Sequence, residues 1–171
     1  MINQLHSKLK GNIQVTICLR VIGYLRQLDL YSESQLRISF LKSRDFYLLS
    51  QIEQISTQNA YSYLSKYIDI TRSNLFDIIT QYRAIFSDNT TIDAKSSQQN
   101  APLASGNVSK SQAFIESEIL LSWLTNKVSN LIEQLETFLP KIQDGSSIFN
   151  ILDQSMYLGQ SLSRVGLDFR G

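Results

Sequence analysis

Apolar residues recur at alternating spacings of four and three through residues 64–85, and this spacing constrains the fold more than any other feature. It returns side chains to one side of an α-helix, because the helix has about 3.6 residues per turn. Phe76, Ile79 and Phe86 lie beside this seam and widen the apolar arc. A two-stranded coiled coil needs only the narrow seam, so this helix is predicted to contact helices on more than one side. The seam consists of Leu64, Ile68, Thr71, Leu75, Ile78, Tyr82 and Ile85.

The same spacing predicts helices elsewhere, at residues 1–10, 13–28, 33–55, 61–87, 110–142 and 148–165. The helix at 13–28 has apolar residues on two faces and is therefore expected to be buried on both. Capping boxes, in which a hydroxyl and a glutamine side chain bond each other's backbone N–H, are predicted at Ser32 with Gln35 and at Ser109 with Gln112. Ser146 or Ser147 is expected to cap the last helix.

The composition favours a few long elements. Seven Gly and two Pro in 171 residues leave room for few turns. Residues 89–109 are rich in Ser, Thr, Gln and Asn, and such a segment cannot bury enough apolar surface to become ordered. The predicted organisation is all-α, with a first helical part at 1–88, a flexible polar linker at 89–109 and a second helical part at 110–171.

The second helical part contains two further patterns. Heptad spacing from Leu121 to Ile142 predicts a long seam on one helix. A track of small residues, Ser155, Gly159 and Ser163, follows on the last helix. Glycine inside a helix costs about 1 kcal/mol relative to alanine, so Gly159 suggests that another backbone approaches closely. A substitution such as Gly159→Leu should then disrupt folding or assembly.

The candidate interaction residues are those expected at close contacts between helices. They are Phe76, Tyr82, Phe86, Ser155, Gly159 and Ser163.

Charge and reactive residues point away from several functional classes. Hydrophobic residues make up 43% of the chain, charged residues 18%, and the net charge is +1. Without a basic block there is no footprint for nucleic acid or for a polybasic membrane surface. The most apolar run, 13–28, contains Arg20 and Arg26 and falls short of the roughly 18 residues of a membrane span.

The residues that carry catalysis and metal binding are sparse. The chain has one cysteine, Cys18, and one histidine, His6. These exclude an internal disulfide, a thiolate metal cluster and a site built on paired histidines. No phosphate-binding glycine loop is present. Arg44 and Asp45 are read as a structural ion pair rather than as an acid–base pair. No catalytic residue, metal or cofactor is therefore predicted, and an enzyme is not expected.

Several blocks, taken together, resemble subunit 8 of the conserved oligomeric Golgi complex. The strongest are residues 75–88, with the run from Phe76 to Phe86, and residues 152–157, which continue as 161–166 and 168–171. Further matches lie at residues 12–14, 18–26, 33–37 and 40–45. Members of that family are longer, so this chain is expected to correspond to a middle portion.

The resemblance implies a non-enzymatic subunit of a vesicle-tethering complex. Such a subunit would be an elongated antiparallel bundle or rod of five or six helices, peripheral on the cytosolic face of the Golgi membrane. It would act in intra-Golgi retrograde transport and in protein transport. Its implied partners are the other subunits of the complex, with membrane fusion proteins and small GTPases beyond them. The alternative is a generic coiled-coil scaffold that self-associates through the 121–142 heptads.

Overall fold

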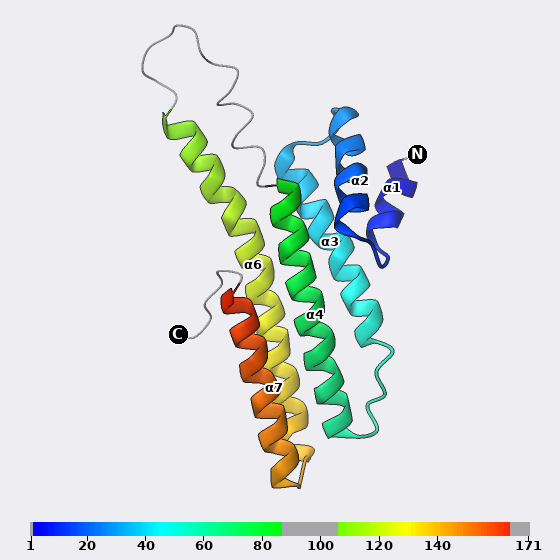
Figure 1. The fold of residues 1–171 in the computed structure, drawn as a ribbon, viewed down its shortest axis with the longest axis vertical. Coiled ribbons are helices and arrows are strands. Elements are labelled where there is room, and N and C mark those ends of the chain that lie inside the picture. Colours follow the sequence, from blue (N-terminus) through cyan, green and yellow to red (C-terminus); the bar gives the residue numbers. More distant parts are fainter. Residues whose placement is uncertain (1, 87–105, 165–171) are drawn as a thin grey trace, which may run out of the picture. The chain divides into compact units, whose positions relative to one another are not determined.

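Residues 2–86 and 106–164 are described by the computed structural model, and every regular element in them is helical (Figure 1). The elements are α1 (Ile2–Leu9), α2 (Val15–Gln27), α3 (Glu33–Ile52), α4 (Ala60–Phe86), α6 (Gly106–Phe138), the 3₁₀ turn η1 (Leu139–Lys141) and α7 (Gly145–Arg164). The prediction of an all-α fold is confirmed for this part of the chain. The predicted linker lies outside the described residues from 89 to 105, and its last four residues form the start of α6.

Side-chain caps explain where several of these helices begin. At α3 the capping box is confirmed: the Ser32 N–H donates to Gln35 Oε1 at 2.9 Å, and the Gln35 N–H donates to Ser32 Oγ at 3.3 Å. Ser109 lies inside α6 rather than at its start, so the second predicted box is wrong.

The cap of α7 also differs from the prediction. Oδ2 of Asp144 accepts hydrogen bonds from the Ser147 N–H at 2.9 Å and from both neighbouring hydroxyls, Ser146 Oγ and Ser147 Oγ. The aspartate, rather than either serine, satisfies the free N–H at this helix start. These bonds lower the pKa of Asp144 from 3.8 to about 2, and the bonds from the two hydroxyls are the largest cause. α7 therefore begins three residues before its predicted start.

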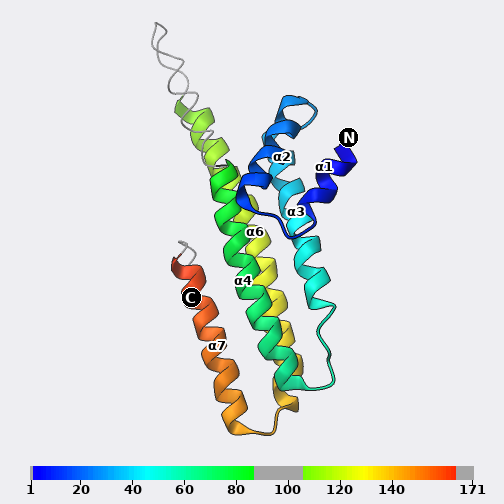
Figure 2. The ribbon, with the colours of Figure 1, turned by 45° about the vertical axis from the view of Figure 1, so that its right-hand side comes forward.

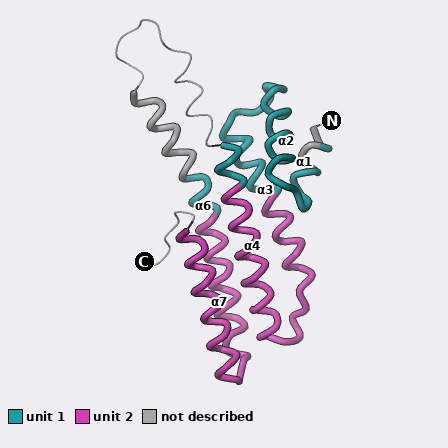
Figure 3. The backbone as a smooth tube through the Cα atoms, in the orientation of Figure 1, with its two compact units in different colours: residues 1–43, 81–123 teal, residues 44–80, 124–171 magenta. Residues whose placement is uncertain are grey.

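The described residues belong to two compact units (Figure 3). Unit 1 contains Met1–Ser43 and Gln81–Trp123, and unit 2 contains Arg44–Thr80 and Leu124–Gly171. Each unit therefore combines residues from before and after the predicted linker. The predicted division into helical parts at 1–88 and 110–171 concerns the order of segments in the sequence, and it stays a prediction.

Unit 2 is built from segments of four helices, and pairs of polar side chains connect one helix to another. Asp45 of α3 forms an ion pair with Lys127 of α6. The other pairs are Asn74 Nδ2 to Gln51 Oε1 at 2.8 Å, Tyr63 Oη to Gln134 Oε1 at 2.9 Å and Asn150 Nδ2 to Tyr61 Oη at 2.8 Å. These bonds link α4 to α3, α6 and α7. In unit 2, α4, α6 and α7 run side by side in both ribbon views (Figures 1 and 2).

The interior of unit 2 is apolar and rich in aromatic side chains. Leu64, Ile68 and Leu75 of the predicted α4 seam are fully buried. The ring of Tyr63 lies 4.3 Å from that of Phe138 and 5.9 Å from that of Tyr67, measured between centroids. Burial, assisted by the nearby Tyr63 and Glu133, raises the pKa of Tyr67 to about 12. The seam of α4 in unit 2 is thus covered by its neighbours, whereas Phe76 beside the seam is 44% exposed.

In unit 1, α1 packs against α2, α2 contacts the last turns of α4, and these turns contact the first part of α3. The buried side of α2 consists of Cys18, Val21, Ile22 and Leu25. Ile17 and Leu28, which were predicted to be buried, are 43% and 36% exposed. The prediction that this helix is covered on two sides is therefore wrong within the described residues. Only one arc of α2 faces the interior.

Candidate interaction surfaces

Two arginines bind the carboxyl end of α4 in unit 1, and we call this pair the arginine clamp. One η nitrogen of Arg26 donates to the backbone oxygen of Ile85 at 3.2 Å, and one of Arg37 donates to that of Phe86 at 3.3 Å. The last carbonyl groups of a helix have no partner within the helix and carry partial negative charge. Arginine donors at these carbonyls therefore stabilise the end of α4.

The clamp is held in place by α3 and by aromatic rings. Arg26 makes two hydrogen bonds to the Glu33 carboxylate, at 3.1 and 2.5 Å. The guanidinium of Arg37 lies 4.8 Å from the centre of the Phe86 ring and 5.6 Å from that of Tyr82. Cation–π contacts of this kind contribute on the order of 1 kcal/mol each. The clamp thus joins α2, α3 and α4.

Tyr82 and Phe86, two of the predicted interaction residues, are buried in unit 1. Their ring centres lie 4.9 Å apart, and both rings pack against Phe40 of α3, at 6.3 and 5.9 Å. They make close helix contacts within the chain and present no outward surface. Whether they also serve a partner stays a prediction.

Gln81 fixes the position of α2 against α4 from the buried side. Its Nε2 donates to the backbone oxygen of Ile13 at 3.1 Å, and its Oε1 accepts the thiol of Cys18 at 3.7 Å. Cys18 is fully buried. The glutamine and the cysteine therefore have structural roles, which agrees with the reading of Cys18 as a small buried side chain.

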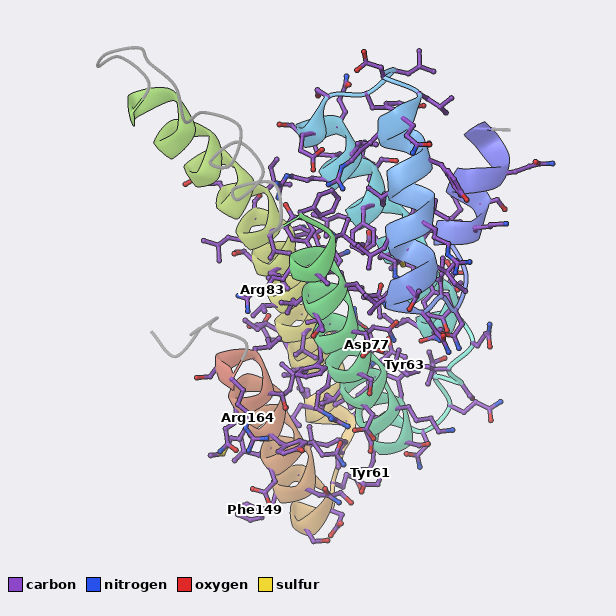
Figure 4. All side chains as sticks on the ribbon, turned by 45° about the horizontal axis from the view of Figure 1, so that its top comes forward. Tyr61, Tyr63, Asp77, Arg83, Phe149 and Arg164 are labelled. Atoms are coloured by element: carbon purple, nitrogen blue, oxygen red, sulfur yellow. The ribbon has the colours of Figure 1, made fainter. Side chains whose placement is uncertain are left out.

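The outer side of α7 in unit 2 carries large apolar side chains in a row. Phe149, Leu152 and Met156 are 70%, 54% and 57% exposed, and Figure 4 shows Phe149 on the outer side of the helix. Their spacing of three and four places them on one side. The inner side of the same helix consists of Ile151, Leu158 and Leu162, all buried. We call the exposed row the α7 outer stripe.

The predicted small-residue track lies beside this stripe. Ser155 and Ser163 are half-buried, and the Ser155 hydroxyl donates to the Ile151 backbone oxygen at 2.8 Å. A Cβ placed on Gly159 would meet nothing within 4 Å. Within the described residues, therefore, no backbone approaches Gly159 closely. The space that the glycine leaves is open on the side of α7 next to the stripe.

Phe76, the remaining predicted residue, is 44% exposed on α4 in unit 2. The structure therefore does not bring the six predicted residues together in one place. Two are buried in unit 1, three follow one flank of α7, and Phe76 projects from α4. Sequence reasoning missed the α7 outer stripe, although the three–four spacing of Phe149, Leu152 and Met156 was visible. It also missed the clamp, because no local pattern links Arg26 or Arg37 to the end of α4.

The described residues offer helix surfaces rather than a chemical centre. Nowhere in residues 2–86 and 106–164 do three His, Cys, Asp or Glu side chains come together in a way that could hold a metal ion. None of the helices in the described ranges is long and apolar enough to cross a membrane. What these ranges do offer is apolar side chains exposed on packed helices, and polar pairs that fix how those helices pack.

These features define a class of protein, an all-α protein of packed helices with apolar side chains exposed on their outward sides. The chain belongs to the Dor1-like family, whose model matches residues 1–171. It is similar to proteins named conserved oligomeric Golgi complex subunit 8, which confirms the resemblance seen in the sequence. The identity is 44% over 171 residues for the protein from Bos taurus, 43% over 171 residues for that from Homo sapiens and 42% over 172 residues for that from Drosophila melanogaster.

The match covers this chain almost completely but covers only part of each relative. Residues aligned with the Bos taurus and Homo sapiens proteins make up 100% of the chain and 25% and 26% of those proteins, and for Drosophila melanogaster the shares are 99% and 28%. The chain thus spans about a quarter of the length of these curated relatives. No solved structure matches the chain.

Proposed function

We propose that this chain is a non-enzymatic helical part of a Golgi vesicle-tethering subunit, acting in intra-Golgi retrograde transport and protein transport. Two lines of support combine here. The chain belongs to the Dor1-like family, and its matched relatives are named as subunits of an oligomeric Golgi complex. The described residues hold exposed helix surfaces and no metal cluster.

The observation that carries the proposal is the α7 outer stripe. A helix on the surface of a monomer presents a polar outer side, whereas one with apolar rows on two sides is normally covered on both. α7 buries Ile151, Leu158 and Leu162 inward and exposes Phe149, Leu152 and Met156 outward. A subunit that assembles through helix contacts needs such an outward row, because buried apolar area stabilises association.

The open flank at Gly159 fits the same role. Small residues allow a neighbouring helix to approach closely, and the large side chains of the stripe supply the apolar area beside them. We assign Ser155, Gly159 and Ser163 to this contact, together with the stripe. Phe76 is a further candidate on α4. Tyr82 and Phe86 act indirectly, since they hold the end of α4 in the core of unit 1.

The proposed partners are the other subunits of the tethering complex, in contact with the α7 outer stripe. Membrane fusion proteins and small GTPases are proposed as further partners of the whole assembly. The proposed location is the cytosolic face of the Golgi membrane, where the protein would be peripheral. The assignments of fusion proteins, small GTPases and the Golgi membrane rest on the family, whereas the contact with other subunits rests also on the α7 outer stripe.

Self-association through the heptads of α6 is the less favoured function. In unit 2, Leu124 and Leu131 of that seam are buried by the chain's own side chains, although Leu121 in unit 1 is 47% exposed. A seam that is already packed within the unit cannot also serve as the core of a coiled coil between copies. Light scattering of the full chain distinguishes the two functions, because a scaffold would be oligomeric without any partner.

Affinity purification from the cells of origin tests the proposal. The tagged protein should recover other subunits of the Golgi complex, and the double variant Phe149→Gln/Met156→Gln should recover them less well. The matched control is Leu49→Gln/Ile132→Gln, which replaces side chains of similar exposure (45% and 49%) on α3 and α6 of unit 2. Recovery of no such subunit by the unaltered protein overturns the function. Equal losses in both double variants would remove the assignment to α7.

A further inference from the structure

Helix α2 of unit 1 has an exposed apolar row of its own, with a basic residue inside it. Ile17, Tyr24 and Leu28 are 43%, 53% and 36% exposed, and Arg20 between them is exposed as well. The spacing of three, four and four puts these four residues on one side of the helix. They extend over about three turns, or roughly 16 Å. We call these four residues the α2 stripe.

The orientation of the stripe is fixed by the contacts on the other side of α2. Cys18, Val21, Ile22 and Leu25 are buried, and Cys18 bonds to Gln81 of α4. Arg26 is tied both to Glu33 and to the backbone oxygen of Ile85. The helix therefore cannot turn its exposed apolar side inward without breaking buried contacts. Something outside the described residues is needed to cover the stripe.

Charge decides what kind of partner fits. Residues 1–28 contain Lys8, Lys10, Arg20 and Arg26 and neither Asp nor Glu, and the first acidic residue, Asp29, is exposed directly after Leu28. Arg26 is neutralised by Glu33, whereas Arg20 lies within the stripe and Lys8 is exposed on α1, which packs against α2. A surface that is apolar and basic is complemented by one that is apolar and acidic.

We propose that the α2 stripe binds an amphipathic helix of a partner protein, with apolar anchors every three to four residues and Asp or Glu beside them. Three turns of exposed apolar positions match the anchor spacing of helix recognition. A second copy of this chain is disfavoured, because neither stripe has an acidic side chain that could pair with Arg20 of the other. An anionic membrane is disfavoured because surface attraction takes a cluster of about four to eight basic residues.

This inference is independent of the function proposed for α7, because it concerns a different helix and unit. The test places the photo-cross-linking residue p-benzoylphenylalanine at Tyr24 in the protein made by its own cells. The same residue at Ile132, an exposed position on α6 in unit 2, is the control. After irradiation the cross-linked peptides are sequenced. The expected product joins position 24, and not position 132, to a helical peptide of another protein that is rich in Asp or Glu.

Charge reversal provides the second arm. Arg20→Glu should lower the cross-link yield from position 24 by about ten-fold, since a like charge at an interface costs on the order of 1.4 kcal/mol or more. Because Arg20 is exposed, the melting temperature should not change, and Lys8→Glu provides a second variant on the neighbouring helix. Cross-links from position 24 to lipid, to a second copy of the chain, to a peptide without acidic residues, or to nothing would each overturn the proposal. Full yield in both charge variants would do so as well.

Discussion

Asp144 controls the start of α7 through a carboxylate that is exposed but well bonded. Its pKa is lowered from 3.8 to about 2, chiefly by the Ser146 and Ser147 hydroxyls. The unfolded chain therefore takes up a proton at a higher pH than the folded chain does. The stabilisation is complete above about pH 4 and is lost as the pH falls toward 2.

The variant Asp144→Asn tests this pH dependence, since asparagine caps a helix comparably but does not titrate. The melting temperature of the unaltered chain should exceed that of the variant at pH 6, and the difference should shrink as the pH falls from 4 to 2. Circular dichroism melts of both proteins at each pH give the comparison. A difference that stays constant over this range would show that the Asp144 carboxylate does not carry the effect.

Substitutions at Gly159 should separate folding from the proposed partner binding. A Cβ at this position meets nothing within 4 Å, so Gly159→Ala should stabilise the chain by about 1 kcal/mol through helix propensity alone. Urea denaturation measures this gain. Gly159→Leu should also fold, contrary to an expectation of general disruption, and should weaken recovery of the proposed partners. A marked loss of stability in the alanine variant would mean that a backbone does approach this residue.

At the scale of a single helix, the arginine clamp determines how firmly α4 ends. Arg37 is buried, and it donates to the backbone oxygen of Phe86 and to Tyr82 Oη. Replacing it with methionine keeps much of the apolar volume but removes the charged donors. The variant Arg37→Met should therefore lose about 2 kcal/mol of stability, as hydrogen bonds from charged groups contribute about 1.5–3 kcal/mol.

Urea unfolding of the variant checks this value, with Arg20→Met as the matched control. Arg20 is exposed on α2, so its replacement should change stability by less than about 0.5 kcal/mol. Similar losses of stability in both variants would show that Arg37 contributes through its positive charge alone and not through its bonds in the clamp.

Most helices could be predicted from the sequence because their apolar spacing is local. Their ends could be predicted only where the cap was a standard one, as at Ser32 and Gln35. α3 was predicted to end at residue 55 but ends at Ile52. Beyond that point the N–H groups of Gln54 and Ile55 donate to the backbone oxygens of Gln51 and Ile52, three residues earlier, so the α-helical bonding pattern does not continue. α6 ends at Phe138 and the chain continues as the 3₁₀ turn η1, because Pro140 has no N–H to bond the backbone oxygen four residues earlier.

The candidate surfaces were less predictable, since burial depends on residues that are distant in the sequence. Periodicity shows that Ile17 and Leu28 lie on an apolar side of α2 but not which side meets α4. Tyr82 was expected at a helix contact and lies at one, yet its partner Phe40 comes from a helix 42 positions earlier. Gly159 was predicted to lie where another backbone approaches closely. The sequence pattern alone does not distinguish a backbone of this chain from that of a partner.

For the whole molecule, the proposed function depends on the sides of packed helices. The polar pairs Asn74–Gln51 and Tyr63–Gln134 and the ion pair of Asp45 with Lys127 each join two helices of unit 2. Such pairs favour one arrangement of the helices, because leaving either member buried without its partner costs energy. A fixed arrangement of these helices would present the α7 outer stripe to the proposed partner in one geometry.

Removal of the α7 outer stripe should therefore change the surface of the molecule without changing its fold. In the triple variant Phe149→Gln/Leu152→Gln/Met156→Gln, three exposed apolar side chains become polar, and contiguous apolar surface of this kind marks association sites. The folded triple variant should bind less of the dye anilinonaphthalene sulfonate than the unaltered chain and should melt at a similar temperature. The control Ile151→Gln/Leu158→Gln alters the buried side of the same helix and should lower the melting temperature and increase dye binding. A triple variant that melts early would place the stripe in the core of the fold.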